Sequence, residues 1–151
     1  MTFADLGLAQ PILDGIRTAG YENPTEIQLK AIPMALDGRD LIALGQTGSG
    51  KTAAFGLPIL HRLLDGEPGL RALILVPTRE LCVQVAEQIR VYASGCDLKV
   101  CTAFGGIDSN DTGMGAYDSG TGVWTWVAGQ GDEGGYSVTV TVCDAEVCTV
   151  T

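Results

Sequence analysis

Basic residues are scarce in this sequence. The 151 residues include 9 Lys and Arg, 18 Asp and Glu and a single His, which gives a formal net charge of −9. All Lys and Arg lie before Ile107, so the chain from there onward carries acids without any basic residue. Proteins that bind nucleic acid by bulk charge attraction have a basic face, and this class is therefore not favoured.

The sequence also lacks a long apolar run. No stretch reaches the roughly 20 apolar residues that a membrane-spanning helix needs. The N-terminus, MTFADLGLAQ, does not have the basic and then apolar layout of a secretory signal. We therefore expect a cytoplasmic chain that does not contact a membrane, and nothing in the sequence indicates its oligomeric state.

Cysteine is present, but in no metal-binding arrangement. Cys82, Cys96 and Cys101 are scattered, and we expect them to be reduced, because a cytosolic domain needs no crosslink. Cys143 and Cys148 lie close together, so they could close a small hairpin in an oxidising compartment or remain thiols in the cytosol. One such pair without a His partner gives poor support for zinc.

The first part of the chain, residues 1–106, alternates between helical and strand patterns. Helices are expected over 11–20, 25–38, 50–66 and 79–94, and strands over 40–44, 71–77 and 98–104. Short apolar runs between helical segments are typical of buried strands. This alternation predicts an α/β fold in which helices cover a parallel sheet.

The composition changes abruptly near Gly106. From Ile107 onward there are eight Gly, seven Thr and seven Val, and no segment is helical in pattern. β-Branched runs separated by Gly and Asp predict three antiparallel strands, over 122–129, 134–144 and 146–151. The predicted organisation is a lobe over 1–106, a linker over 107–115 and a β-strand tail over 116–151.

The segment GQTGSGKT, from Gly45 to Thr52, follows a predicted strand and opens a predicted helix. It fits the pattern G-x-x-x-x-G-K-[ST] of a phosphate-binding loop, whose inward N–H groups and helix N-terminus attract an anion. Lys51 is expected to reach the β- and γ-phosphates, and Thr52 to offer its hydroxyl to Mg²⁺. The alternative, a Gly-rich turn with a solvated lysine, is disfavoured by the flanking strand and helix. The residues expected to contact the nucleotide here are Gln46, Thr47, Gly48, Ser49, Gly50, Lys51 and Thr52.

Three further blocks accompany this loop in a fixed order. They are Phe3 ahead of GYENPTEIQ (Gly20 to Gln28), PTREL (Pro77 to Leu81), and the pair Gly105 and Gly106 after the third predicted strand. With these blocks, residues 1–106 resemble the start of the first RecA-like lobe of a DEAD-box ATP-dependent RNA helicase. The resemblance implies a nucleotide-binding lobe whose ligand is ATP or ADP with Mg²⁺.

By that resemblance, Gln28 hydrogen-bonds the adenine edge, Tyr21 or Phe3 packs on the adenine face, and Thr25 supports the phosphate loop. A second interpretation is a helix capping box, in which Thr25 and Gln28 satisfy each other's backbone donors. Thr25 can take both roles, but one Gln28 amide cannot serve both tasks well. The neighbouring Tyr21 and the downstream phosphate loop favour adenine recognition.

The resemblance also implies contacts with RNA. The Thr78 hydroxyl and backbone N–H groups after Pro77 would hold an RNA phosphate with Arg79 nearby, and Gly105 and Gly106 would let the backbone approach the sugar-phosphate. Without the family pattern, Pro77 and Thr78 simply start a helix and the glycine pair is a turn. Any RNA binding is expected to be weak.

Several motifs that the family uses for RNA contact and hydrolysis do not occur in these 151 residues. T-P-G-R, D-E-A-D, S-A-T and a second lobe would follow the glycine pair. Phosphoryl transfer also needs carboxylates for Mg²⁺ and water, and an arginine worth about 10³–10⁵ in rate. We expect binding with little hydrolysis and no unwinding, and the question of enzymatic activity stays open. An incomplete sheet would also leave an apolar edge exposed.

The tail segment VWTWVAGQGDEGGYSVTVTVCDAEVCTVT resembles, weakly, the last strands of PKD or Ig-like β-sandwich modules. It has too few strands for an independent sandwich. Because the change falls at a motif edge and not at a domain edge, it suggests a chimera or a gene fusion. Two alternatives to nucleotide binding therefore stay open: a folded chimera without biochemical activity, and a secreted β-sandwich interaction module.

Overall fold

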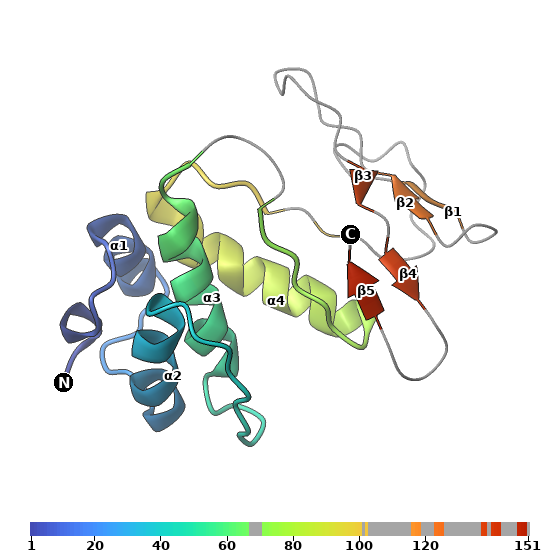
Figure 1. The fold of residues 1–151 in the computed structure, drawn as a ribbon. Coiled ribbons are helices and arrows are strands. Elements are labelled where there is room, and N and C mark those ends of the chain that lie inside the picture. The colour runs from blue at the N-terminus through green and yellow to red at the C-terminus, as the bar shows by residue number, and fades with distance from the viewer. Residues whose placement is uncertain are drawn as a thin grey trace. The chain divides into compact units, whose positions relative to one another are not determined.

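The computed structural model describes residues 1–66, 71–100 and 102, and five short strands between residues 116 and 150 (Figure 1). The chain divides into two compact units. The first comprises Met1–Gly66 and Val83–Val100, and the second comprises Glu67–Cys82 and Cys101–Thr151. Among the helices of the described residues, none combines the length and the apolar character that a membrane span requires.

The helices follow the local signals of the sequence. They are η1 Phe3–Leu6, α1 Gln10–Thr18, α2 Glu26–Leu36, α3 Lys51–Leu63, α4 Arg79–Tyr92 and η2 Ala93–Gly95. Pro11 lies in the first turn of α1, where its missing N–H costs no hydrogen bond. Gly20 (φ 76°) and Gly38 (φ 78°) follow α1 and α2 in the left-handed conformation that ends many helices. Each predicted helix is therefore present, with bounds shifted by a few residues.

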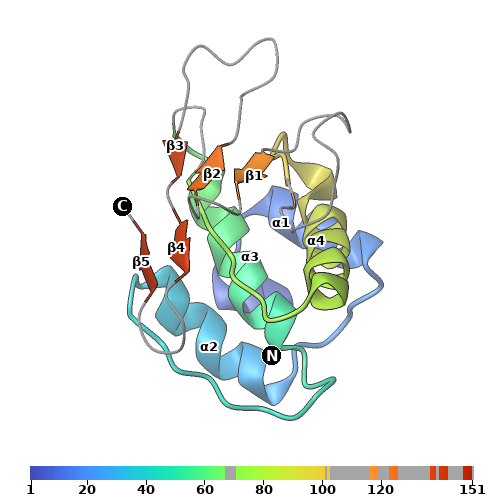
Figure 2. The ribbon, with the colours of Figure 1, turned by 90° about the vertical axis from the view of Figure 1, so that its right-hand side faces the viewer.

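The core of the first unit is formed by apolar helix faces, with α3 lying between α2 and α4 (Figure 2). Full burial of a large aliphatic side chain stabilises a fold by about 1.5–3 kcal/mol. The largest fully buried side chains are Tyr92, Ile12, Ile16, Ile32, Leu57 and Pro58. The helices that flank the phosphate loop are thus anchored in one core.

Two glycines allow α1 to approach the end of α4 closely. A Cβ built at Gly15 would overlap the backbone carbonyl of Tyr92, and one built at Gly95 would overlap the carbonyl of Pro11. A third contact joins α3 to the start of α1, because the backbone N–H of Ala9 donates to Nδ1 of His61 at 3.0 Å. These contacts hold together α1, α3 and the end of α4, which are far apart in the sequence.

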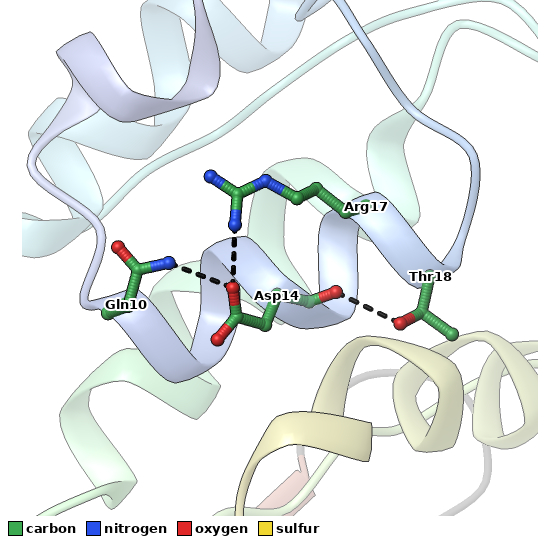
Figure 3. A network of polar contacts seen from close by, with 4 residues as sticks. All are labelled: Gln10, Asp14, Arg17 and Thr18. Atoms are coloured by element: carbon green, nitrogen blue, oxygen red, sulfur yellow. Dashed lines mark hydrogen bonds and ion pairs between the residues drawn. The ribbon is translucent and has the colours of Figure 1, made fainter.

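The exposed side of α1 carries a small polar network (Figure 3). The Asp14 carboxylate accepts a hydrogen bond from the Gln10 amide at 2.8 Å and pairs with Arg17 at 2.7 Å. The Thr18 hydroxyl donates to the Asp14 backbone carbonyl at 3.0 Å. Exposed pairs one turn apart contribute about 0.2–0.5 kcal/mol each, so the network is a local aid to this helix.

The strands of the predicted parallel sheet are absent from the described residues. Residues 40–44, 71–77 and 98–100 form no strand. Ile42 is 95% exposed and Leu44 is 91% exposed, so these two side chains of the first segment are not covered by the part of the chain that the structure describes. A helix closes its hydrogen bonds within one segment, whereas a strand needs another strand beside it. The apolar run at 40–44 was recognisable in the sequence, but whether it pairs with another strand depends on residues far away in the chain.

Among the described residues, the second unit contains five strands of two or three residues. They are β1 Ala116–Asp118, β2 Val123–Thr125, β3 Ser137–Val138, β4 Val140–Val142 and β5 Cys148–Val150. All pairs are antiparallel, in the orders β1-β2-β3 and β4-β5. Strands this short do not establish a β-rich module, so the interpretation of 116–151 as a separate tail stays a prediction. The predicted linker, 107–115, and Cys143 lie outside the described residues.

Candidate phosphate-binding site

The segment from Gly45 to Thr52 forms a tight turn that leads directly into α3. The N–H of Ser49 donates to the carbonyl of Gln46 at 3.2 Å, which closes the turn. Gly48 (φ 81°) and Gly50 (φ 86°) take left-handed backbone angles that other residues rarely adopt. Gly50 is the N-cap of α3, so the positive end of this helix lies at the loop.

The ammonium group of Lys51 is folded back onto the loop. It donates to the carbonyl oxygen of Gly45 and to that of Gln46, the latter at 2.7 Å. Thr52 follows in the first turn of α3 and is partly exposed. The lysine therefore donates to two loop carbonyls, and the same ammonium is the group expected to meet phosphate oxygens.

Two side chains from the start of α2 hold the loop. The Thr25 hydroxyl donates to the carbonyl of Ser49 at 2.9 Å, and the Gln28 amide nitrogen donates to the carbonyl of Gly50 at 3.1 Å. The Gln28 amide oxygen accepts the backbone N–H of Thr25 at 2.9 Å, as in a capping box. Gln28 is only 3% exposed. The Gln28 amide thus takes part in the capping box, and Thr25 contacts the loop as the resemblance implied. Recognition of adenine by Gln28 stays a prediction.

Two glycines of the loop lie close to neighbouring side chains. A Cβ at Gly50 would overlap the Gln28 amide nitrogen, and a Cβ at Gly45 would lie 2.7 Å from Oγ of Ser49. That hydroxyl is itself buried without a hydrogen-bond partner. Gly45 was not among the predicted site residues, although it is the first glycine of the motif.

A cavity of about 430 Å³ lies beside the loop. Its lining residues are Thr25, Glu26, Ile27, Lys30, Leu44, Gly45 and Ser49. At its rim the Lys30 ammonium and the Glu26 carboxylate are 2.6 Å apart, and this hydrogen bond lowers the pKa of Glu26. Sequence reasoning missed Ile27, Lys30 and Leu44, because only the folded chain brings α2 beside residues 44–49.

The aromatic residues that were predicted to pack on a base lie in different environments. Phe3 is 4% exposed and belongs to the apolar core, whereas Tyr21 is 41% exposed. The Tyr21 ring lies 6.0 Å from that of Tyr92, and the two hydroxyls are 3.4 Å apart. Base stacking by Phe3 or Tyr21 stays a prediction.

Of the residues predicted to contact RNA, Pro77, Thr78 and Arg79 are described. The Thr78 hydroxyl accepts the N–H of Leu81 at 3.2 Å, so Thr78 caps α4, as the simpler interpretation required. Arg79 is the first residue of that helix. Gly105 and Gly106 lie outside the described residues. RNA contact by any of these residues stays a prediction.

Comparison with known proteins gives a consistent result. The sequence profile of the DEAD/DEAH box helicase family matches residues 25–118. A curated relative, "DEAD-box ATP-dependent RNA helicase 36" of Oryza sativa subsp. japonica, is 51% identical over 108 residues. That match covers 72% of this chain but 22% of the relative, so the chain spans less than a quarter of that protein's length.

Solved structures agree with these sequence matches. A DEAD box protein from Methanococcus jannaschii has a TM-score of 0.67 and 42% identity, over 72% of this chain and 30% of that one. S. cerevisiae Dbp5 bound to RNA and ADP BeF3 has a TM-score of 0.60 and 37% identity, over 63% of this chain and 25% of that one. These neighbours support an α/β fold of the RecA-like kind. The family match runs past Gly106, and no finding supports a separate origin for the residues that follow.

Proposed function

Because this chain belongs to the DEAD/DEAH box helicase family, we propose that it binds ATP or ADP with Mg²⁺ through the loop Gly45 to Thr52 and the segment Gly20 to Gln28. One observation carries the proposal. Thr25, predicted to support the phosphate loop, and Gln28, predicted to read the base, both hydrogen-bond to that loop, at 2.9 and 3.1 Å. The two predicted halves of a nucleotide site are therefore adjacent in the folded chain.

The groups at the loop suit a polyphosphate. The N-terminus of α3 supplies backbone N–H groups and a positive partial charge, and Lys51 supplies a mobile ammonium. Thr52 would offer its hydroxyl oxygen to Mg²⁺, which when bound would neutralise phosphate charge. Gln28 would read the adenine edge, with Tyr21 or Phe3 against its face.

Binding without appreciable hydrolysis is proposed for this chain on its own. Lys51 and Thr52 can hold the substrate, but the D-E-A-D and S-A-T strings do not occur in the 151 residues. An arginine finger alone accounts for about 10³–10⁵ in rate in related phosphate-loop enzymes. We likewise propose that this chain alone does not unwind RNA. The cellular compartment of the chain stays a prediction.

Weak RNA binding is a further part of this proposal. Thr78 and Arg79 begin α4, where backbone N–H groups near a helix N-terminus can meet a phosphate. Dbp5, one of the similar structures, is bound to RNA as well as to a nucleotide analogue. The net charge of −9 gives no bulk attraction to RNA, so contacts through Pro77, Thr78, Arg79, Gly105 and Gly106 would have to supply the affinity.

Calorimetry with Mg-ATP and Mg-ADP tests the proposal. Lys51→Ala removes the ammonium, and we expect binding to weaken at least tenfold, the scale of a charge-assisted hydrogen bond. Lys99→Ala, at an exposed position outside the loop, is the matched control and should leave affinity unchanged. Absence of heat from both nucleotides with the unaltered chain would show that the chain does not bind nucleotide.

A further inference from the structure

Tyr21, which is predicted to pack on the base, is fixed by the end of α1. Its backbone N–H donates to the Ile16 carbonyl at 3.2 Å, and the N–H of Gly20 donates to the Arg17 carbonyl at 3.0 Å. Together with the left-handed Gly20 (φ 76°), these two bonds form a Schellman motif, which ends a helix in a defined way. The Tyr21 side chain is 41% exposed, so part of it is accessible to a ligand.

The Tyr21 side chain also contacts Tyr92, in the last turn of α4. The two ring centroids are 6.0 Å apart, with 45° between the ring planes. This separation lies within the range of roughly 4.5–7 Å at which aromatic rings attract each other. The Tyr92 hydroxyl donates to the Tyr21 hydroxyl at 3.4 Å, which is long for a bond between two hydroxyls. The ring contact is therefore the main link between these two side chains.

Tyr92 is a rigid support for Tyr21, because other helices enclose it. It is only 2% exposed. A Cβ built at Gly15 would overlap the Tyr92 carbonyl, so the backbone of α1 lies directly against this residue. On the side of α3, a Cβ built at Gly56 would lie 3.8 Å from Cδ2 of the Tyr92 ring, which is an ordinary contact. α1 and α3 thus fix the ring against which Tyr21 packs.

We propose that Tyr92 is a positioning residue for base binding, because it holds the Tyr21 ring in the orientation that packs on the base. The proposal rests on the proposed function, since it concerns the same nucleotide. An accessible tyrosine ring that turns freely about its side-chain torsion angles loses this freedom when it binds, and the loss weakens affinity. A ring already held by Tyr92 has less freedom to lose. Tyr92 is buried, so it acts through Tyr21 and does not itself touch the base.

The orientation of Tyr21 can be measured by NMR in the unaltered chain, where three-bond couplings to its Cγ report the first side-chain torsion angle. We expect the couplings of a single rotamer before Mg-ATP is added, and the same couplings at saturation. Mg-ATP should shift the ring signals of Tyr21, whereas inorganic tripolyphosphate with Mg²⁺, which has no base, should not. Averaged couplings that become those of one rotamer only when ATP binds would overturn the proposal.

Calorimetry on two variants separates positioning from a general effect on the fold. Tyr92→Leu removes the ring, so Mg-ATP should bind about two- to tenfold more weakly, the range expected when one more side chain must be ordered, while tripolyphosphate binding should not change. Tyr92→Phe keeps the ring and should bind Mg-ATP within about twofold of the unaltered chain, because only a long hydrogen bond is lost. Ile89→Val, which removes one methyl group from another buried position of α4, is the control and should change neither affinity.

The possible failures are distinguishable. If Tyr92→Leu leaves ATP affinity unchanged, weakens ATP and tripolyphosphate equally, or still weakens ATP in a chain that already carries Tyr21→Leu, the positioning role is wrong while the nucleotide site stands. If Tyr92→Leu does not fold, the couplings of the unaltered chain decide. If the unaltered chain binds neither ATP nor tripolyphosphate, the proposed function fails, and the positioning role fails with it.

Discussion

Glycine residues allow the backbone conformation of the phosphate loop. Gly48 and Gly50 have φ angles of 81° and 86°, and a left-handed angle costs another L-residue about 1–2 kcal/mol. The two positions differ in their surroundings, because nothing lies within 4 Å of a Cβ at Gly48, whereas a Cβ at Gly50 meets Gln28. The motif pattern requires a glycine at position 50, and the structure supplies a second reason for it.

Gly50→Ala is expected to lower the free energy of unfolding by about 2–5 kcal/mol, because left-handed strain adds to the overlap with Gln28. Gly20→Ala is the matched control: Gly20 has a φ of 76° but open space around its Cβ position. Its cost should be about 1–2 kcal/mol, from strain alone. Urea denaturation followed by circular dichroism measures both values, and equal losses would show that the Gly50 backbone does not rest on Gln28.

Some features of the helices are set by residues nearby in the sequence, and others depend on contacts with distant residues. The starts and ends of α1 and α2 follow Pro11, Thr25, Gly20 and Gly38, which act within one turn of helix. The contact between α1 and the end of α4 has no such signal. It joins Gly15 to Tyr92, and only the folded chain shows why α1 has a glycine in its interior.

Gly15→Ala is expected to destabilise the first unit by about 1–3 kcal/mol, although alanine favours a helix, because its methyl group would overlap the Tyr92 carbonyl. The control is Gly56→Ala, within α3, where the nearest atom to a Cβ is Cγ1 of Ile89 at an ordinary 3.5 Å. That change should be neutral or stabilising by up to about 1 kcal/mol. Thermal denaturation of the two variants should shift the midpoint downward only for Gly15→Ala.

At the scale of the whole first unit, stability at high pH depends on a buried tyrosine. Tyr92 is 2% exposed, and burial, followed by the hydrogen bond with Tyr21, raises its pKa above the usual 10.0. The folded state therefore binds this proton more tightly than the unfolded state does. Its contribution to stability is fully present below about pH 10 and is lost as the pH rises through the folded pKa.

The chain is thus expected to lose stability above pH 10, and Tyr92→Phe should reduce that loss. At pH 7 the same variant should cost about 1 kcal/mol or less, because one long hydrogen bond is removed. Urea denaturation at pH 7 and pH 11 gives both values. Tyr21→Phe removes the 3.4 Å contact but keeps the Tyr92 hydroxyl, so it should stay sensitive to alkali. If Tyr92→Phe lost as much stability at pH 11 as the unaltered chain does, the loss would come from groups other than Tyr92.

Short-range patterns were enough to predict the helices, the loop Gly45 to Thr52 and the family of the chain, because caps, glycines and motif spacing act over a few residues. Long-range contacts were not predictable in this way. The exposure of Ile42 and Leu44 depends on whether a neighbouring strand is present, which no local pattern specifies. Likewise, the hydrogen bond from the Gln28 amide to Gly50 joins residues 22 positions apart, so it became visible only in the folded chain.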